Sequence, residues 1–210
     1  MTLLDRIAPE TLRERSTPVL ETERLVLRAP RPEDATAIAT LANDRRIAEN
    51  TLRIPHPYAL ADARAFLSST GTIDDEPMFM ITARSAGPLG GLALGGTVIG
   101  ACGIARLDGK QPEIGYWLGV PFWGKGYATE AARAVIDHAF GHLGCDLLLA
   151  GARVSNPASR RVLEKCGFQW TGVGLYRIRA IKSSAPVDRF RLDRGLWASL
   201  KSWGEVKRVA

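Results

Sequence analysis

Four elements in a fixed order between residues 112 and 165 constrain the fold more than any other feature. Alternating apolar residues predict a strand over 112–120, and apolar residues spaced by three and four predict a helix from Ala128 to about Leu143. A short apolar run at 146–154 is typical of a buried strand, and Asn156-Pro157 opens a second helix. Strand, helix and strand in this order predict a crossover connection and a parallel strand pair, hence an α/β fold.

The first half of the chain predicts further strands and helices around this unit. Strands are expected at 24–29, 78–83 and 97–107, and helices at 33–41 and 60–68. The glycine-rich segment GPLGGLALGG joins the second and third of these strands and is interpreted as a long hairpin connection.

The end of the chain predicts a hairpin over 168–181 and 187–194, followed by an amphipathic tail. We expect an N-terminal extension at 1–16, a single domain at 17–195 and the tail at 196–210. Trp197 and Trp203 are expected to pack the tail onto the body or onto a second subunit, so a homodimer stays open.

Composition excludes several classes of protein. With 210 residues, 46% of them hydrophobic and 24% charged, one ordinary globular domain is expected. The sequence has neither a secretory leader nor an apolar run of membrane-spanning length, so we expect a cytoplasmic protein without a membrane partner. The net charge of +6 is compatible with an anionic ligand, but the basic residues form no continuous stripe, so no direct nucleic-acid partner is expected.

Cysteine and histidine spacing predicts no metal site. No CxxC pair is present, and Cys166 lies on the apolar side of its helix, where a core position is favoured over a nucleophile. His138 and His142 are four residues apart on one helix, but a third ligand is missing.

The segment WGKGYATEA at 123–131 places two glycines and a lysine directly before a helix. The first N–H groups of a helix lack partners inside the helix and carry partial positive charge, so a glycine entrance lets phosphate oxygens approach them. An ordinary turn remains the alternative, because the segment has neither the spacing of a P-loop nor a GxGxxG pattern.

Two separated segments, EIGYWLGVPFWGKGYATEA and VSNPASRRVLEKCGF, resemble the Gcn5-related N-acetyltransferases. Within that family they resemble the RimJ/RimL-type branch, which acetylates the amino termini of ribosomal proteins. The resemblance runs from about Thr22 to about Asp193. It implies a central mixed, mostly antiparallel twisted sheet with one splayed parallel strand pair, flanked by helices. It also implies acetyl-CoA as cosubstrate and no metal.

The resemblance implies where acetyl-CoA binds. Of the family's three phosphate-motif positions, Gly126 and Ala128 agree, while Trp123 replaces the usual Gln or Arg. Backbone groups around Leu118 and Val120 are expected to pair with the pantetheine. The implied residues at the phosphates and along the arm are Trp123, Gly124, Lys125, Gly126, Tyr127, Ala128, Thr129, Asn156 and Ser159.

Acetyl transfer also requires a base, because an amino group is largely protonated at neutral pH. Glu113 is our candidate, and a surface salt bridge is the equal alternative. Strand alternation places Glu113 and Tyr116 on opposite faces unless a bulge intervenes. The two glycines in the strand suggest either a bulge or a place where another backbone approaches closely.

The other catalytic roles fall on a backbone group and a hydroxyl. The N–H of Val120 is expected to stabilise the developing oxyanion. Many family members carry a tyrosine in the second helix that protonates the leaving thiolate, but this chain has Leu163 there. Ser159, near the sulfur, is therefore expected to act as the hydrogen-bond donor.

The sequence thus predicts transfer of an acetyl group from acetyl-CoA to a primary amine by direct attack in a ternary complex. A protein N-terminal amine, as in ribosomal proteins, is the favoured acceptor. A small-molecule amine (polyamine, amino acid or aminoglycoside) and a non-catalytic acyl-CoA sensor are the alternatives. A wide acceptor groove would favour a peptide, and a closed acidic pocket would favour a polycation.

Overall fold

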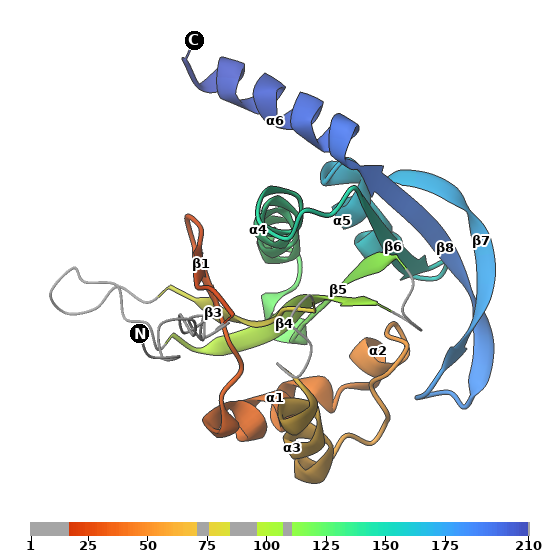
Figure 1. Ribbon diagram of the computed structural model, residues 1–210. Coiled ribbons are helices and arrows are strands. Elements are labelled where there is room, and N and C mark those ends of the chain that lie inside the picture. The colour runs from red at the N-terminus through yellow and green to blue at the C-terminus, as the bar shows by residue number, and fades with distance from the viewer. Residues whose placement is uncertain (1–16, 71–75, 85–95, 107–110, 210) are drawn as a thin grey trace, which may run out of the picture.

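A computed structural model of the chain describes residues 17–70, 76–84, 96–106 and 111–209, with side chains up to residue 203. Its centre is an eight-stranded sheet of order β1-β2-β3-β4-β5-β6-β8-β7 (Figure 1). The strands are β1 Leu20–Glu21, β2 Leu25–Arg28, β3 Met78–Ala83, β4 Val98–Arg106, β5 Pro112–Leu118, β6 Leu147–Arg153, β7 Gln169–Ile178 and β8 Ser183–Asp193. Only β5 and β6 pair in parallel; the other neighbours in this sheet are antiparallel.

Helices cover both faces of the sheet (Figure 1). They are α1 Ala35–Ala42, α2 Arg45–Ala48, α3 Leu60–Ser69, α4 Tyr127–Gly141, α5 Pro157–Lys165 and α6 Arg194–Val209. Helices α4 and α5 share one hydrophobic core with the sheet, while α1 and α3 pack on the opposite face against Met80, Val98 and Ala101. The predicted α/β class with a mostly antiparallel sheet is confirmed.

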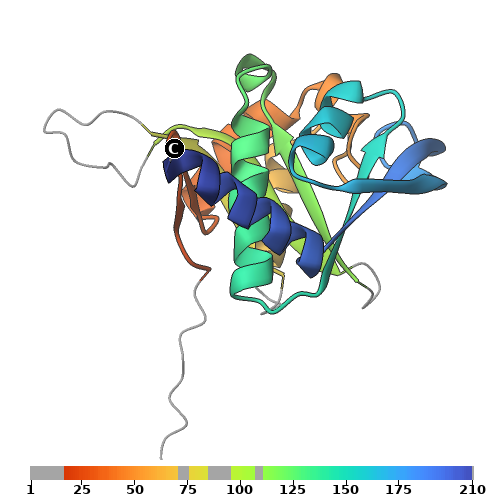
Figure 2. The same ribbon diagram turned by 90° about the horizontal axis from the view of Figure 1, so that it is seen from above.

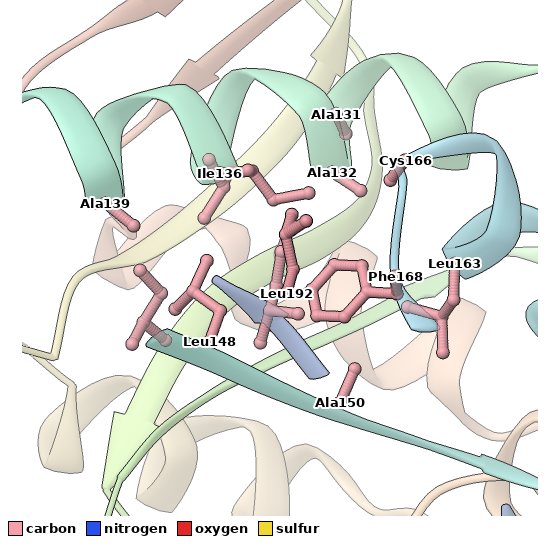
Figure 3. Packing of buried hydrophobic residues seen from close by; sticks show 14 of the residues in the cluster. Ala131, Ala132, Ile136, Ala139, Leu148, Ala150, Leu163, Cys166, Phe168 and Leu192 are labelled. Atoms are coloured by element: carbon pink, nitrogen blue, oxygen red, sulfur yellow. The ribbon is translucent and has the colours of Figure 1, made fainter. Parts of the chain in front are cut away.

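Small side chains let α4 approach the sheet closely. Ala131, Ala132 and Ala139 are fully buried on the face of α4 that meets the β6 and β8 residues Leu148 and Leu192 (Figure 3). Alanine loses no side-chain entropy and leaves room for the larger residues opposite, so the helix is held firmly. The position of α4 relative to the sheet is thereby fixed.

Strands β5 and β6 diverge soon after they pair. Their ladder consists of Glu113↔Leu149 and Ile114↔Ala150, although β5 continues to Leu118 and β6 to Arg153. The predicted splayed parallel pair is therefore present. The divergence leaves backbone groups of both strands facing a gap, which is where the candidate site lies.

Of the two alternatives for the β5 glycines, a bulge or a close approach of another backbone, the bulge is wrong. Pairing with β4 runs without a shift from Gly100↔Leu118 to Arg106↔Pro112. Gly115 instead faces open space, since an added Cβ would meet nothing within 4 Å, and Gly119 makes room for the side chain of Leu41. Gly115 thus leaves the cleft open and Gly119 allows a close contact, and neither glycine bends the strand.

Two boundaries also differ from the prediction. Strand β8 begins at Ser183, four residues before the predicted start at Val187, because its pairing with β7 continues without interruption to Ile178↔Ser183 and overrides the weak strand propensity of Ser and Pro. Helix α4 ends at Gly141, and Gly144, predicted as its end, adopts a positive φ of 68° in the following turn. Most of the glycine-rich segment 87–96 lies outside the described residues.

The tail is a helix anchored on α4. Arg194 donates to the carbonyl oxygens of Phe140 and Cys145, both at 2.7 Å. Trp197 stacks on Phe140 at 5.2 Å and donates to Asp137 Oδ1, so α6 crosses α4 as Figure 2 shows. The predicted packing of Trp197 onto the body is confirmed, whereas Trp203 is 73% exposed. No helix in the described parts of the chain is both long and apolar enough to cross a membrane.

A buried ion pair ties the first 3₁₀ turn to β2. Arg28 and Asp34 are only 6% and 5% exposed and form two hydrogen bonds of 2.7 and 2.8 Å. Burial opposes ionisation of Asp34, but bonds from Arg28 and from the Arg31 N–H outweigh it and hold its pKa below the ordinary value.

Replacing Asp34 with asparagine should lower the free energy of unfolding by about 3–5 kcal/mol, because Arg28 would stay buried without its countercharge. Glu49→Gln, which breaks the exposed pair with Arg45, should cost less than about 1 kcal/mol. Urea unfolding at neutral pH measures both. Because the pKa of Asp34 is lowered, its contribution should disappear as the pH falls below about 4. Equal losses in the two variants would contradict this account.

Candidate active site

The gap between β5 and β6 opens into a cleft of about 1030 Å³. Its lining comes from both helix layers: Ile38 of α1 and Phe66 of α3 on one side, Ala128 of α4 and Val162 of α5 on the other. A cleft of this size accommodates a large ligand together with part of a second one.

A glycine-bearing entrance to α4 forms one end of the cleft. Gly124 and Gly126 have positive φ angles of 75° and 81°, and Gly126 is the N-cap residue. An added Cβ at Gly124 would meet nothing within 4 Å. The first-turn N–H groups of Tyr127, Ala128 and Thr129 have no helical acceptor before them, so this end offers donors without side-chain obstruction.

Arg24, which the sequence did not single out, braces this entrance. It donates through Nε to Glu130 Oε2 at 2.7 Å and through Nη1 to the carbonyl oxygen of Lys125 at 2.9 Å. Thr22 Oγ1 adds a 2.6 Å bond to the other oxygen of Glu130. The pairing of ETER with GKGYATE fixes the loop before α4, and no local pattern in the sequence predicts it.

Two predicted cofactor residues lie apart from the cleft lining. Lys125 places its ammonium 5.8 Å from the Phe122 ring, and neither Lys125 nor Val120 lines the cleft. Trp123 does line it, with its indole N–H donating to the Leu118 carbonyl at 2.7 Å. Tryptophan at this position thus holds the strand end instead of carrying charge.

The other predicted residues gather in the cleft. The lining contains Leu118, Trp123, Gly124, Gly126, Tyr127, Ala128, Thr129, Asn156, Ser159 and Glu113.

Asn156 and Ser159 are placed by the start of α5. Asn156 is the N-cap residue, and its Oδ1 accepts the Ser159 N–H at 3.1 Å, as the Asn-Pro pattern predicted. The cap uses only the backbone N–H of Ser159, so the Ser159 hydroxyl is free to contact Tyr116.

Tyr116 meets Ser159 across the cleft. The tyrosine hydroxyl lies 3.0 Å from Ser159 Oγ and 3.2 Å from the Ser159 carbonyl oxygen. Burial raises the pKa of Tyr116 above its ordinary value, so the phenol stays protonated at neutral pH. No role was predicted for Tyr116, because strand alternation places it on the face opposite Glu113. The cleft is lined from both faces of the sheet, and both side chains contribute to it.

The helix position at which many family members carry a tyrosine belongs to the core. Leu163 is 1% exposed and contributes to the main hydrophobic cluster. Cys166 is also buried, and burial raises its pKa to about 11, in agreement with the predicted core thiol.

Glu113 is paired with an arginine. Its two carboxylate oxygens accept bonds of 3.2 and 3.1 Å from Arg189 of β8, and both side chains are mostly buried. The carboxylate lines the cleft, so both interpretations offered for it, base and ion pair, have a physical basis.

The far end of the cleft contains polar atoms without partners. Asn50 Oδ1 and Arg153 Nε are buried and have no hydrogen-bond partner among the described residues. Arg153 Nη1 donates to the Glu49 carbonyl at 2.7 Å, which links β6 to α2. Such atoms are costly unless a ligand pairs with them. Neither residue stands out in the sequence.

Within the described ranges, no group of three or more His, Cys, Asp or Glu side chains could hold a metal ion. His138 stacks on His142 at 5.2 Å and packs edge-on against Phe79. Burial lowers the pKa of His138, so the imidazole is a neutral core residue.

Comparisons with known proteins identify the family of the chain. A family model described as the acetyltransferase (GNAT) domain matches residues 24–169. The uncharacterized N-acetyltransferase p20 of Bacillus licheniformis is 30% identical over 159 residues, which cover 73% of this chain and 84% of p20.

Solved structures of similar fold include RimJ and RimL. RimJ of Mycobacterium smegmatis, in complex with CoA-disulfide, superposes with a TM-score of 0.68 and 19% identity over 85% of this chain and 88% of RimJ. RimL, a ribosomal L7/L12 α-N-protein acetyltransferase in complex with coenzyme A, gives 0.67 and 17% over 84% of this chain and 98% of RimL. At these identities the likeness shows the fold. Together with the domain match and the relatives, it shows that the chain belongs to the GNAT family and is an acetyl-CoA-dependent N-acetyltransferase with RimJ/RimL-like structural neighbours.

Proposed function

We propose that this enzyme acetylates the N-terminal amine of a protein or peptide by direct attack on acetyl-CoA in a ternary complex. The observation that carries the proposal is the cleft between β5 and β6, which is lined from both helix layers and is large enough for two reactants. RimL, whose name describes an α-N-protein acetyltransferase, supports this class of acceptor.

The α4 end of the cleft fits the pyrophosphate of acetyl-CoA. Gly124 faces open space, and among the described residues the only side-chain atom near Gly126 is Nη2 of Arg24, at 3.3 Å from an added Cβ. The first-turn N–H groups supply donors and partial positive charge. Trp123 and Lys125 would flank the phosphates, with Lys125 contributing charge at longer range. Backbone groups of Leu118 and Val120 and the side chain of Asn156 would hold the pantetheine arm.

The reaction itself needs three contributions from the chain. Acetyl-CoA supplies the acetyl thioester; the amine nitrogen forms a bond to its carbonyl carbon, and the carbon–sulfur bond breaks. We assign the Val120 N–H to the carbonyl oxygen, which requires the thioester to reach the turn after β5, since Val120 itself does not line the cleft. Ser159 donates to the departing sulfur, and Tyr116 can donate to Ser159 Oγ in turn, which leaves the serine proton free to point into the cleft.

Removal of the amine proton is assigned to Glu113, directly or through water. Both of its oxygens accept from Arg189, so taking a proton requires one of these bonds to lengthen. The ion pair with Arg189 holds the carboxylate at the cleft wall.

Charge at the acceptor end argues against a polycationic small molecule. Among the described lining residues the carboxylates are Glu113, Asp62 and Glu76, and each is engaged. Asp62 accepts the Ala59 N–H and Glu76 accepts the Arg106 N–H, at 2.9 and 2.8 Å. The lining carries six basic residues against these three carboxylates, and this balance of charge disfavours a polyamine or an aminoglycoside.

A competition assay tests the proposed acceptor. The enzyme and acetyl-CoA are mixed with equal amounts of a peptide with a free N-terminus, the same peptide with a blocked N-terminus and an internal lysine, and spermidine. Mass spectrometry should place the acetyl group on the free N-terminus, at least about tenfold faster than on the other amines. Faster acetylation of spermidine would overturn the proposal.

A further inference from the structure

A second cavity of about 590 Å³ adjoins the acceptor end of the cleft. It is formed by the segment after α2 and by the turn between β7 and β8, which lie side by side in Figure 1. The Arg179 N–H donates to the Leu52 carbonyl at 3.1 Å and holds the two segments together. Its lining is Leu52, Arg53, Pro55, His56, Arg177, Arg179 and Lys182, of which Leu52, Arg53, Pro55 and Arg179 also line the cleft.

This cavity carries unbalanced positive charge. Arg53, Arg177, Arg179 and Lys182, which we call the basic rim, are exposed, and none forms an ion pair with a described residue. The lining contains no carboxylate. By contrast, Arg46 of α2 is paired with Asp44 at 2.7 Å. Like charges held together without counterions favour an anionic partner.

The basic rim is continuous with the reacting centre. The residues shared by the two cavities connect the rim with the cleft that contains Ser159. An extended peptide advances about 3.3 Å per residue, so a few residues could run from the cleft to the rim.

We propose that the basic rim selects acceptors with acidic side chains within the first few residues after the reactive amine. This inference rests on the proposed acetylation of peptide N-termini and adds a substrate class to it. Carboxylates at that distance would meet the guanidinium groups of Arg177 and Arg179 while the amine lies at the thioester. A single-stranded nucleic acid fits less well, because the lining of the second cavity offers His56 but no Phe, Tyr or Trp on which bases could stack.

The test compares two peptides that differ only in charge: one carries Asp and Glu at positions three to six, the other Asn and Gln. The full-length enzyme should acetylate the acidic peptide with a kcat/KM at least about fivefold higher at low salt, and the advantage should shrink as salt is added. In the double variant Arg177→Glu/Lys182→Glu, kcat/KM for the acidic peptide should fall about tenfold, with less than about twofold change for the neutral peptide. Arg64→Glu, a charge reversal on the exposed face of α3 outside both cavities, is the matched control and should change neither.

The outcomes distinguish failure of the acidic preference from failure of the proposed peptide acetylation. Equal rates for the two peptides in the wild type, or an equal loss for both in the double variant, would overturn the acidic preference while leaving peptide acetylation intact. Acetylation of neither peptide, with turnover of spermidine, would overturn the proposed function as well. Tight binding of a single-stranded RNA that the double variant abolishes, without any peptide preference, would reassign the rim to nucleic acid.

Discussion

Replacing Gly126 with aspartate should weaken acetyl-CoA binding by about a hundredfold or more, measured by calorimetric titration. The new carboxylate would project from the N-cap of α4 into the space where an added Cβ meets only Arg24 Nη2, at 3.3 Å. A carboxylate placed directly against the pyrophosphate repels it, and about 3 kcal/mol corresponds to a hundredfold in affinity.

Gly126→Asn is the matched control for this experiment. Asparagine has the same shape as aspartate and tolerates the positive φ of 81° at this position, but it carries no charge. Its affinity should stay within about tenfold of the wild type, and circular dichroism should show both variants folded. If aspartate and asparagine weakened binding equally, the phosphates would not lie at the α4 entrance.

Ser159→Ala should lower kcat about 30-fold while changing the affinity for acetyl-CoA less than about threefold. The loss follows from removing a hydrogen bond that strengthens only as negative charge develops on the sulfur. The Ser159 backbone N–H would still bond to Asn156, so α5 should keep its cap and the unfolding temperature should change little. Steady-state kinetics at saturating acetyl-CoA measures the effect.

Two further variants sharpen that measurement. Ser155→Ala changes an exposed serine outside the cleft lining and should leave kcat unaltered. Tyr116→Phe removes the hydroxyl that lies 3.0 Å from Ser159 Oγ and should lower kcat by a smaller factor, about three- to tenfold. An unchanged kcat in Ser159→Ala would remove Ser159 from the reaction.

The sequence predicted the crossover unit and the glycine entrance because both are local. The spacing of apolar residues predicts β5, α4 and β6, and the Asn156-Pro157 pair predicts the start of α5 and its N-cap. The family resemblance then implied the splayed pair, whose short ladder the structure contains.

Non-local contacts account for what the sequence did not predict. The bulge suggested for β5 does not form. Gly115 faces open space and Gly119 makes room for Leu41, and neither environment can be predicted from the neighbouring residues in the chain. Arg24 reaches Glu130, over a hundred residues away, and Tyr116 reaches Ser159 only because α5 packs beside β5. The basic rim joins two segments separated by more than a hundred residues, which no charge pattern along the chain reveals.

A crystal structure of the chain with acetyl-CoA tests the central claim most directly. We expect the pyrophosphate against the N–H groups of Gly126, Tyr127 and Ala128, the pantetheine between the diverging ends of β5 and β6, and the thioester sulfur within hydrogen-bond distance of Ser159 Oγ. Acetyl-CoA bound outside the gap between β5 and β6, or with its sulfur remote from Ser159, would contradict the account.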